Sequence, residues 1–284
     1  MSRHDEQRQA DGGSRFRLRT RNGRSTRLGS ASGSGTTRNP RPSPLPHIAA
    51  MTWRDGAFIH WPVDPDAIRS RVPEPLEVDT YDGKAWLSVL PFVLARAGLR
   101  GTPSLTRLTT PELNVRTYVR YRGDPGLFFF SVDLGSQFVA EAVGRLARLP
   151  CHHAMMHVGG ADERVAFSSS RTPDVESDAR FSATYRPDGE VFYAEPDSLA
   201  HWLTARRRFY APSGRGRGIL TAEIAHAPWP LQPVELTVHE NTMFEANGLP
   251  EPEPEPDEEP VAYYCGELSM TGSIPRRISR PQVR

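Results

Sequence analysis

The chain has 284 residues, and its 35 Lys and Arg residues nearly balance its 34 Asp and Glu residues, so the formal net charge is +1. Hydrophobic residues make up 37% of the chain and the mean hydropathy is −0.53. No apolar run approaches the roughly 18 residues that cross a membrane, and the start lacks the apolar stretch of a secretory signal. We therefore expect no membrane association.

The two ends of the chain differ in composition from its middle. Residues 1–50 contain ten arginines set among Gly, Ser, Thr and Pro, with almost nothing to bury, which predicts a disordered basic tail. The tail lacks interleaved aromatic residues or a nucleic-acid-binding motif, so we expect no nucleic-acid partner. A start of translation at Met51 is the alternative. Residues 276–284 are also expected to be a disordered tail.

Hydrophobic periodicity and turn residues predict a chain built mainly of short strands. Asp64 followed by Pro65 is typical of a helix start. Residues 95–110, which carry Gly, Pro and Thr, are expected to form a loop long enough to be a lid over a site. Strands are expected over 52–61, 76–80, 85–93, 111–121, 127–134, 151–158, 165–170, 179–185, 218–226, 234–239 and 262–269, and helices over 65–71, 137–148 and 198–209.

Turns from strand to strand dominate this pattern, so the expected fold class is α+β and mainly β. The economical architecture is a mostly antiparallel sheet, closed or half-closed into a barrel, with a few flanking helices. We expect a single domain over residues 51–275, interrupted by an acidic, proline-rich loop at 250–260. Two cysteines far apart in sequence predict unpaired thiols and a cytoplasmic protein.

The segment Pro111–Tyr121, PELNVRTYVRY, alternates strictly between two kinds of side chain. Such alternation is typical of a strand whose two faces have different surroundings. The polar face can simply lie toward water. The next strand, 127–134, is almost wholly apolar, which favours a sheet buried on both faces and a polar face that lines a cavity. We call this face the polar row; it consists of Glu112, Asn114, Arg116 and Tyr118.

Other polar residues have ordinary structural interpretations beside functional ones. His60 and Trp86 lie on early strands, where such residues usually belong to a core. His153 and His157 share one face of the expected strand, but no third ligand has diagnostic spacing, so we expect no metal and no cofactor. Cys151 lies in an apolar setting that does not favour a nucleophilic thiol. The segment 225–231, AHAPWPL, is interpreted as a rigid loop that plugs one end of the barrel.

Four segments together resemble the YqjF-like family, known as domain of unknown function 2071. They are FIHWPVDPDAIRSRVPEPLEVDTYDGKAWLSVLPF, PELNVRTYVRYRGDPGLFFFSVDLGS, ARLPCHHAMM and IAHAPWPLQP, and they keep their order over residues 52–275. The resemblance implies an acetoacetate-decarboxylase-like fold, which is an antiparallel β-barrel or cone with flanking helices around an interior cavity. It implies no known activity.

The resemblance also sets an expectation about chemistry. Decarboxylases of that superfamily use a lysine Schiff base in a Pro-Lys-Lys context after a helix. The corresponding segment here, LPCHH at 149–153, has Cys151 where a lysine is expected. The chain's single lysine, Lys84, lies on an expected turn, where an amine is usually solvated and its pKa is not lowered. We therefore predict that the protein does not decarboxylate β-keto acids through a Schiff base.

Two functions of different classes fit the sequence. In the first, the barrel binds a small oxygenated or carboxylic ligand, either as a binding protein or as a lyase or cyclase without a Schiff base. Arg116 clamps a carboxylate or enolate oxygen and Glu112 is a general acid or base. The expected ligand-binding residues are Asn114, Tyr118, His60, Trp86 and His153.

In the second, the protein is not catalytic and the polar row forms a closed internal network. An interior pocket of roughly 300 Å³ or more favours the first function. Assembly into a homo-oligomer is left open.

Overall fold

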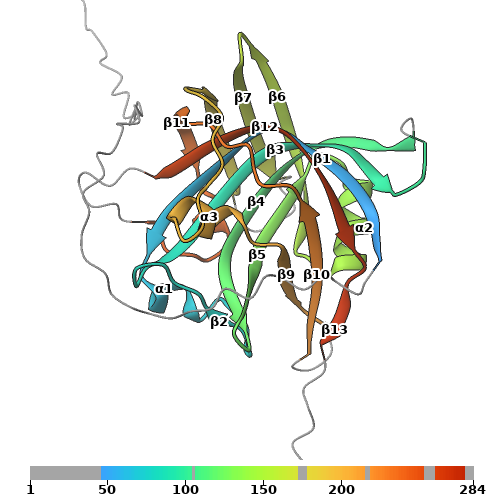
Figure 1. Cartoon of the computed structure of the whole chain (residues 1–284), viewed down its shortest axis with the longest axis vertical. Helices are drawn as coiled ribbons and strands as arrows, with labels where there is room; N and C mark the ends of the chain where they lie inside the picture. Colours follow the sequence, from blue (N-terminus) through green and yellow to red (C-terminus); the bar gives the residue numbers. More distant parts are fainter. Residues whose placement is uncertain (1–45, 104–105, 172–177, 215–217, 253–259, 279–284) are drawn as a thin grey trace, which may run out of the picture.

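The computed structural model of the chain describes residues 46–103, 106–171, 178–214, 218–252 and 260–278. Within them the chain forms thirteen strands and four helices, so the fold is mainly β as predicted (Figure 1). The helices are α1 (Pro65–Arg69), α2 (Gln137–Ala147), α3 (Leu199–Thr204) and α4 (Met243–Ala246). The strands are β1 (His47–Val63), β2 (Glu77–Val78), β3 (Ala85–Leu99), β4 (Leu108–Tyr121), β5 (Asp124–Leu134), β6 (Cys151–Ala161), β7 (Arg164–Arg171), β8 (Arg180–Pro187), β9 (Arg208–Pro212), β10 (Ile219–His226), β11 (Val234–Asn241), β12 (Val261–Ser273) and β13 (Arg276–Ile278).

Seven strands close into a ring. Long antiparallel registers join β12 to β1, β1 to β3, β3 to β4, and β4 to β5. The other side is closed by β9 and β10, where the parallel β5–β9 contact has two residue pairs and the β10–β12 contact has three. Because these two contacts are short, the ring is a cone with one weakly joined side, not a regular barrel.

The sheet continues from β5 through β6, β7, β8 and β11, which form an arm outside the ring (Figure 1). One apolar cluster joins the arm to the outer face of the ring. Ile59 and Leu87 from the ring are fully buried there, and Phe167 and Phe181 from the arm are 2% and 1% exposed. Burying side chains of this size stabilises a fold by about 1.5–3 kcal/mol each, so this cluster fixes which ring face is outer.

The two faces of β4 therefore have different buried surroundings, as its alternating sequence predicts. Leu113 and Val115 belong to the outer cluster, whereas Tyr118 packs with interior residues. Asn114, Arg116 and Tyr118 are 6%, 9% and 0% exposed. These three residues of the polar row are thus turned into the ring and not toward solvent, whereas Glu112 is half-buried.

The expected loop over 95–110 is wrong at both ends, where 95–99 belong to β3 and 108–110 to β4. β3 extends to Leu99 and β4 begins at Leu108, with Ala97 opposite Leu108. Arg96 has a φ of 52° and accompanies a bulge in this register. Small residues in this stretch have weak strand propensity, but β1 and β4 flank it on both sides and pairing decides the outcome.

Other differences have similar causes. The helix expected over 198–209 ends at Thr204, because the chain continues as β9 and pairs with β5 and β10. Residues 276–278, expected in a disordered tail, form β13 against β10, and β1 already begins at His47. The expected tail over 1–45 and most of the acidic loop, 253–259, lie outside the described residues. No helix in the described ranges is both long and apolar enough to cross a membrane.

Candidate functional site

Three adjacent ring strands bring most of the predicted site residues together. His60 on β1 lies opposite Ser88 on β3, and Ser88 lies opposite Arg116 on β4. The same register places Trp86 beside Tyr118, and both pack in one interior cluster. These side chains share the inner face of the ring because they occupy alternate positions on neighbouring strands.

One part of this group is a closed network. His60 Nδ1 lies 2.7 Å from Ser88 Oγ, and Ser88 Oγ lies 3.0 Å from the Tyr118 hydroxyl. The Tyr118 hydroxyl donates to the carbonyl oxygen of Leu203 at 2.9 Å. Leu203 belongs to α3, so this bond holds α3 across the ring interior above β4 (Figure 1). Tyr118, predicted as a ligand-binding residue, therefore has a structural task as well.

The other part is open. Seven side-chain polar atoms in the described chain are buried without a hydrogen-bond partner, and four of them belong to predicted site residues. Leaving such an atom unpaired costs roughly 1–3 kcal/mol, and native proteins contain few of them. Four of these atoms lie on the inner face of the ring. The four atoms are His60 Nε2, Trp86 Nε1, Asn114 Oδ1 and Arg116 Nε.

Arg116 is a buried cation without a carboxylate at ion-pair distance in the described chain. Its guanidinium carbon lies 6.0 Å from the centre of the Phe58 ring, at the limit of a cation–π contact. Burial lowers the pKa of Arg116. Burial and, as a smaller cause, the positive charge of Arg116 lower the pKa of His60 well below its usual value. His60 is therefore neutral near pH 7.

Glu112 lies four residues before Arg116 on the same strand, roughly 13 Å away along the backbone. Burial raises the pKa of Glu112 to about 7, although a hydrogen bond from Asn114 opposes this shift. The carboxyl group thus exchanges its proton in the physiological range, which suits a general acid or base. The predicted charged pair is on one inner face, but the two groups do not neutralise each other.

Cys151 begins β6 opposite Val132 of β5 and packs against the interior cluster. Burial, together with smaller effects of the carboxylates of Glu112 and Asp133, raises the pKa of its thiol to about 12. The thiol is therefore protonated at neutral pH, in agreement with the apolar setting inferred from the sequence. His153 shares the face of Cys151 by alternation. No hydrogen bond links it to the polar row in the described chain.

The sequence analysis did not assign several residues that complete this site. Ser88 is the only hydroxyl-bearing residue in the apolar run AWLSVLPFV, which was the available signal. Trp229 lies edge-on to Phe58, with ring centres 4.9 Å apart, and its indole nitrogen donates to the carbonyl of Thr204. No sequence pattern connects Trp229 to β1, because the contact depends on the ring closing.

A pocket of about 740 Å³ lies elsewhere, lined in part by Asp55, Gly160, Arg164 and Tyr264. Tyr264 belongs to the outer apolar cluster, so this pocket is on the arm side of the sheet and does not contain the polar row. In the described ranges no three His, Cys, Asp or Glu side chains gather as a metal site would require.

A family model for DUF2071, an uncharacterized conserved protein, matches residues 50–269. The chain belongs to the DUF2071 family. It is 40% identical over 219 residues to the uncharacterized protein YqjF of Bacillus subtilis strain 168, and the match covers 77% of this chain and 87% of YqjF. The resemblance identified in the sequence is confirmed.

Solved structures with low sequence identity share the fold. The enduracididine biosynthesis enzyme MppR complexed with pyruvate is 15% identical, covers 88% of this chain and 99% of its own, and has a TM-score of 0.57. An acetoacetate decarboxylase is 18% identical over 84% of this chain and 92% of its own, with a TM-score of 0.55. An acetoacetate decarboxylase-like enzyme from Sphingomonas wittichii RW1 is 12% identical over 87% and 99%, with a TM-score of 0.54. These matches confirm the acetoacetate-decarboxylase-like fold.

Proposed function

We propose that this DUF2071 protein binds a small oxygenated acid inside the ring, with a carboxylate or enolate oxygen on Arg116. The observation that carries the proposal is the group of four buried polar atoms without partners on one inner face. Burying an isolated guanidinium is unfavourable by several kcal/mol unless an anion pairs with it. Its planar fork suits the two oxygens of a carboxylate.

The surrounding groups suit the other end of such a ligand. Trp86 Nε1 is a donor, Asn114 carries an acceptor, and neutral His60 supplies either role through Nε2. Glu112, with a pKa of about 7, exchanges a proton with the ligand. The chemistry this allows is a lyase or cyclase reaction of an oxygenated acid. His153 belongs to the proposed site only through its place on the face of Cys151.

A Schiff base is not part of the proposal. Lys84 is exposed at a turn, where it forms an isolated bridge with Tyr81. Its amine is therefore solvated, in contrast to the buried amine that a Schiff-base lysine presents. Borohydride treatment in the presence of acetoacetate is expected to give no covalent adduct by mass spectrometry. An adduct on Lys84 would contradict this part of the proposal.

MppR, which shares this fold, is complexed with pyruvate, and this supports a keto acid as the first ligand class to test. The alternative function is a protein whose interior network is closed and binds nothing. The bonds among His60, Ser88 and Tyr118 favour this alternative for that part of the site, whereas the open atoms of Asn114 and Arg116 favour a ligand.

A thermal-shift screen against small carboxylic and keto acids separates the two functions. A ligand at 100 times its Kd stabilises a protein by about 2.7 kcal/mol, which raises Tm by roughly 5–10 °C in a domain of this size. We expect the shift to be lost in Arg116→Met and kept in Arg186→Met, a change at an exposed arginine on β8. A shift that survives in Arg116→Met would contradict the proposed clamp.

A further inference from the structure

His226, the last residue of β10, has a fixed tautomer. Its Nδ1 lies 2.7 Å from the carbonyl oxygen of Ala227. A carbonyl oxygen only accepts, so Nδ1 carries the proton and, in the neutral ring, Nε2 carries the lone pair. Within the described chain no group is hydrogen-bonded to Nε2. The ring is half-buried, so this nitrogen is available to a bound molecule.

The surroundings of His226 keep its ring neutral. Burial lowers the pKa of His226, the bond to Ala227 opposes this, and the charges of Arg207 and Arg116 lower the pKa further.

A chain of three ring contacts links His226 to Arg116. The His226 ring centre is 4.8 Å from that of Trp229, and Trp229 is 4.9 Å edge-on from Phe58. The Phe58 ring in turn lies 6.0 Å from the guanidinium carbon of Arg116. Trp229 is held by its bond to the Thr204 carbonyl. A neutral base and a buried cation therefore border one rigid pair of aromatic rings.

We propose that His226 is the catalytic base of the ring: its Nε2 removes a proton from the carbon next to the carbonyl of a keto acid held by Arg116. This inference rests on the proposed function above. The electron pair of the broken C–H bond forms a C=C bond, and the carbonyl π electrons move to oxygen. Arg116 stabilises the resulting enolate oxygen, and His226 returns the proton in the reverse step. No further reactant is needed.

The tautomer can be tested without a ligand. Nitrogen-15 NMR of the imidazole rings, with the His226 signals assigned from their loss in His226→Gln, is expected to show a neutral ring at pH 7 with the proton on Nδ1. A proton on Nε2, or a charged ring at pH 7, would overturn the proposal, because no lone pair would then be presented to the ligand.

The catalytic step can be tested with pyruvate in deuterated water. Proton NMR is expected to show saturation transfer from the protein to pyruvate and loss of the methyl signal faster than in buffer alone. His226→Gln is expected to keep the saturation transfer and to slow the exchange at least ~100-fold, the usual contribution of a general base. His239→Gln is the matched control, since His239 is exposed and bonds to Thr184 on the arm.

The remaining outcomes distinguish failure of the proposed function from failure of the role of His226. Absence of saturation transfer in the unmodified protein means that the proposed keto-acid function fails, and this inference fails with it. Saturation transfer without exchange, or exchange that survives in His226→Gln, leaves the binding site standing and overturns the role of His226. Exchange lost in Glu112→Gln but kept in His226→Gln would assign the base to Glu112 instead.

Discussion

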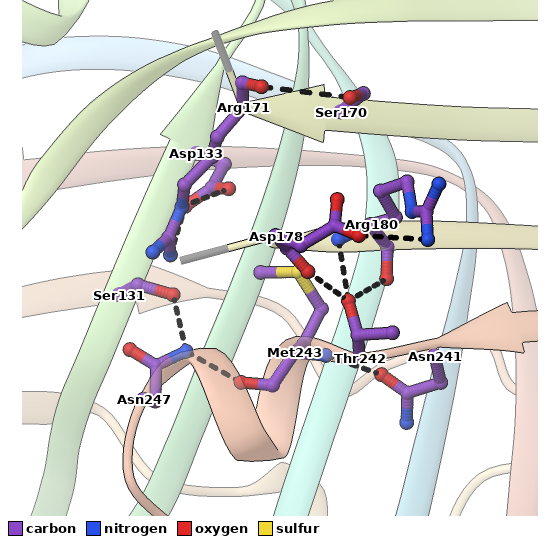
Figure 2. A network of polar contacts seen from close by, with 10 residues as sticks. All are labelled: Ser131, Asp133, Ser170, Arg171, Asp178, Arg180, Asn241, Thr242, Met243 and Asn247. Atoms are coloured by element: carbon purple, nitrogen blue, oxygen red, sulfur yellow. Dashed lines mark hydrogen bonds and ion pairs between the residues drawn. The ribbon is translucent and has the colours of Figure 1, made fainter. Parts of the chain in front are cut away.

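Two arginines are buried in this molecule in opposite ways. Arg171 on β7 donates from Nε and Nη2 to both carboxylate oxygens of Asp133 on β5, at 2.8 Å each (Figure 2). The two side chains are 3% and 0% exposed. Arg116 is 9% exposed, with no carboxylate at ion-pair distance in the described chain. The two arginines are therefore similar in burial and differ in whether a carboxylate pairs with them.

The positions of the two arginines explain the contrast. Asp133 lies on the side of β5 that meets the arm, where Ser131 also accepts a hydrogen bond from the side-chain amide of Asn247 just after α4 (Figure 2). These contacts tie β7 and the α4 segment to the ring. Arg116 lies on the inner side of the ring, where it interacts with Tyr118 and the Phe58 ring and with no carboxylate in the described chain. The ion pair of Arg171 holds the arm to the ring, whereas the proposed function assigns the missing anion of Arg116 to a ligand.

The largest expected effect is on the paired arginine. Arg171→Met leaves the carboxylate of Asp133 buried and unpaired, so the free energy of unfolding is expected to fall by about 3–5 kcal/mol in urea denaturation. The double variant Asp133→Leu with Arg171→Met removes both charges and is expected to recover part of this loss. A loss under 1 kcal/mol in Arg171→Met would show that this pair does not hold the arm to the ring.

The next effect is the pH dependence contributed by Glu112. The folded protein holds this proton up to a pKa of about 7, whereas the unfolded chain releases it near 4.5. Stability from this group is therefore complete below pH 4.5 and is lost as pH rises to 7 and above, by up to about 3 kcal/mol. Glu112→Gln should remove that loss, so its advantage over the unmodified protein should grow between pH 5 and pH 8. Parallel pH profiles would contradict the raised pKa.

A smaller effect is expected at the closed network. Tyr118→Phe removes the donor to the Leu203 carbonyl and is expected to lower the free energy of unfolding by roughly 1–2 kcal/mol. Ser88→Ala loosens the same network without freeing α3 and should cost less. If Tyr118→Phe left stability unchanged, the bond from β4 to α3 would not matter for the fold.

The smallest effect concerns Cys151. With its thiol pKa near 12, the folded protein should be alkylated by iodoacetamide at pH 8 at least ~100-fold more slowly at Cys151 than the unfolded chain. Peptide masses distinguish Cys151 from Cys265, whose thiol pKa is also raised to about 12 by burial. Rapid modification of folded Cys151 would contradict the raised thiol pKa and would favour Cys151 as a nucleophile.

The sequence favoured the inward direction of the polar row over a water-facing one. Its own alternation and the apolar β5 beside it favour two buried faces, and β4 is buried on both faces from Leu113 to Val119. The pairing of Asp133 with Arg171 was beyond sequence reasoning, because the two residues are 38 positions apart and meet only when the arm folds back. β9 was missed for the same reason, since its pairing with β5 is parallel and distant in sequence.

The site was predicted less completely than the row. His60 and Trp86 were included as neighbours, and register places them there. The segment with His226 was interpreted as a rigid loop that plugs the barrel. In the structure Trp229 of this loop is held by a hydrogen bond to the carbonyl of Thr204. What the sequence did not contain were the contacts of His226 with Trp229 and of Trp229 with Phe58, which give that histidine a second interpretation.

The most direct test of the proposal that Arg116 binds a ligand is the free energy of unfolding of Arg116→Met, measured in urea without added ligand. The guanidinium has no protein carboxylate to leave behind, so we predict a value within about 1 kcal/mol of the unmodified protein, or above it. A loss of 3 kcal/mol or more, equal to that of Arg171→Met, would mean that Arg116 is a structural residue and that the ring interior is closed.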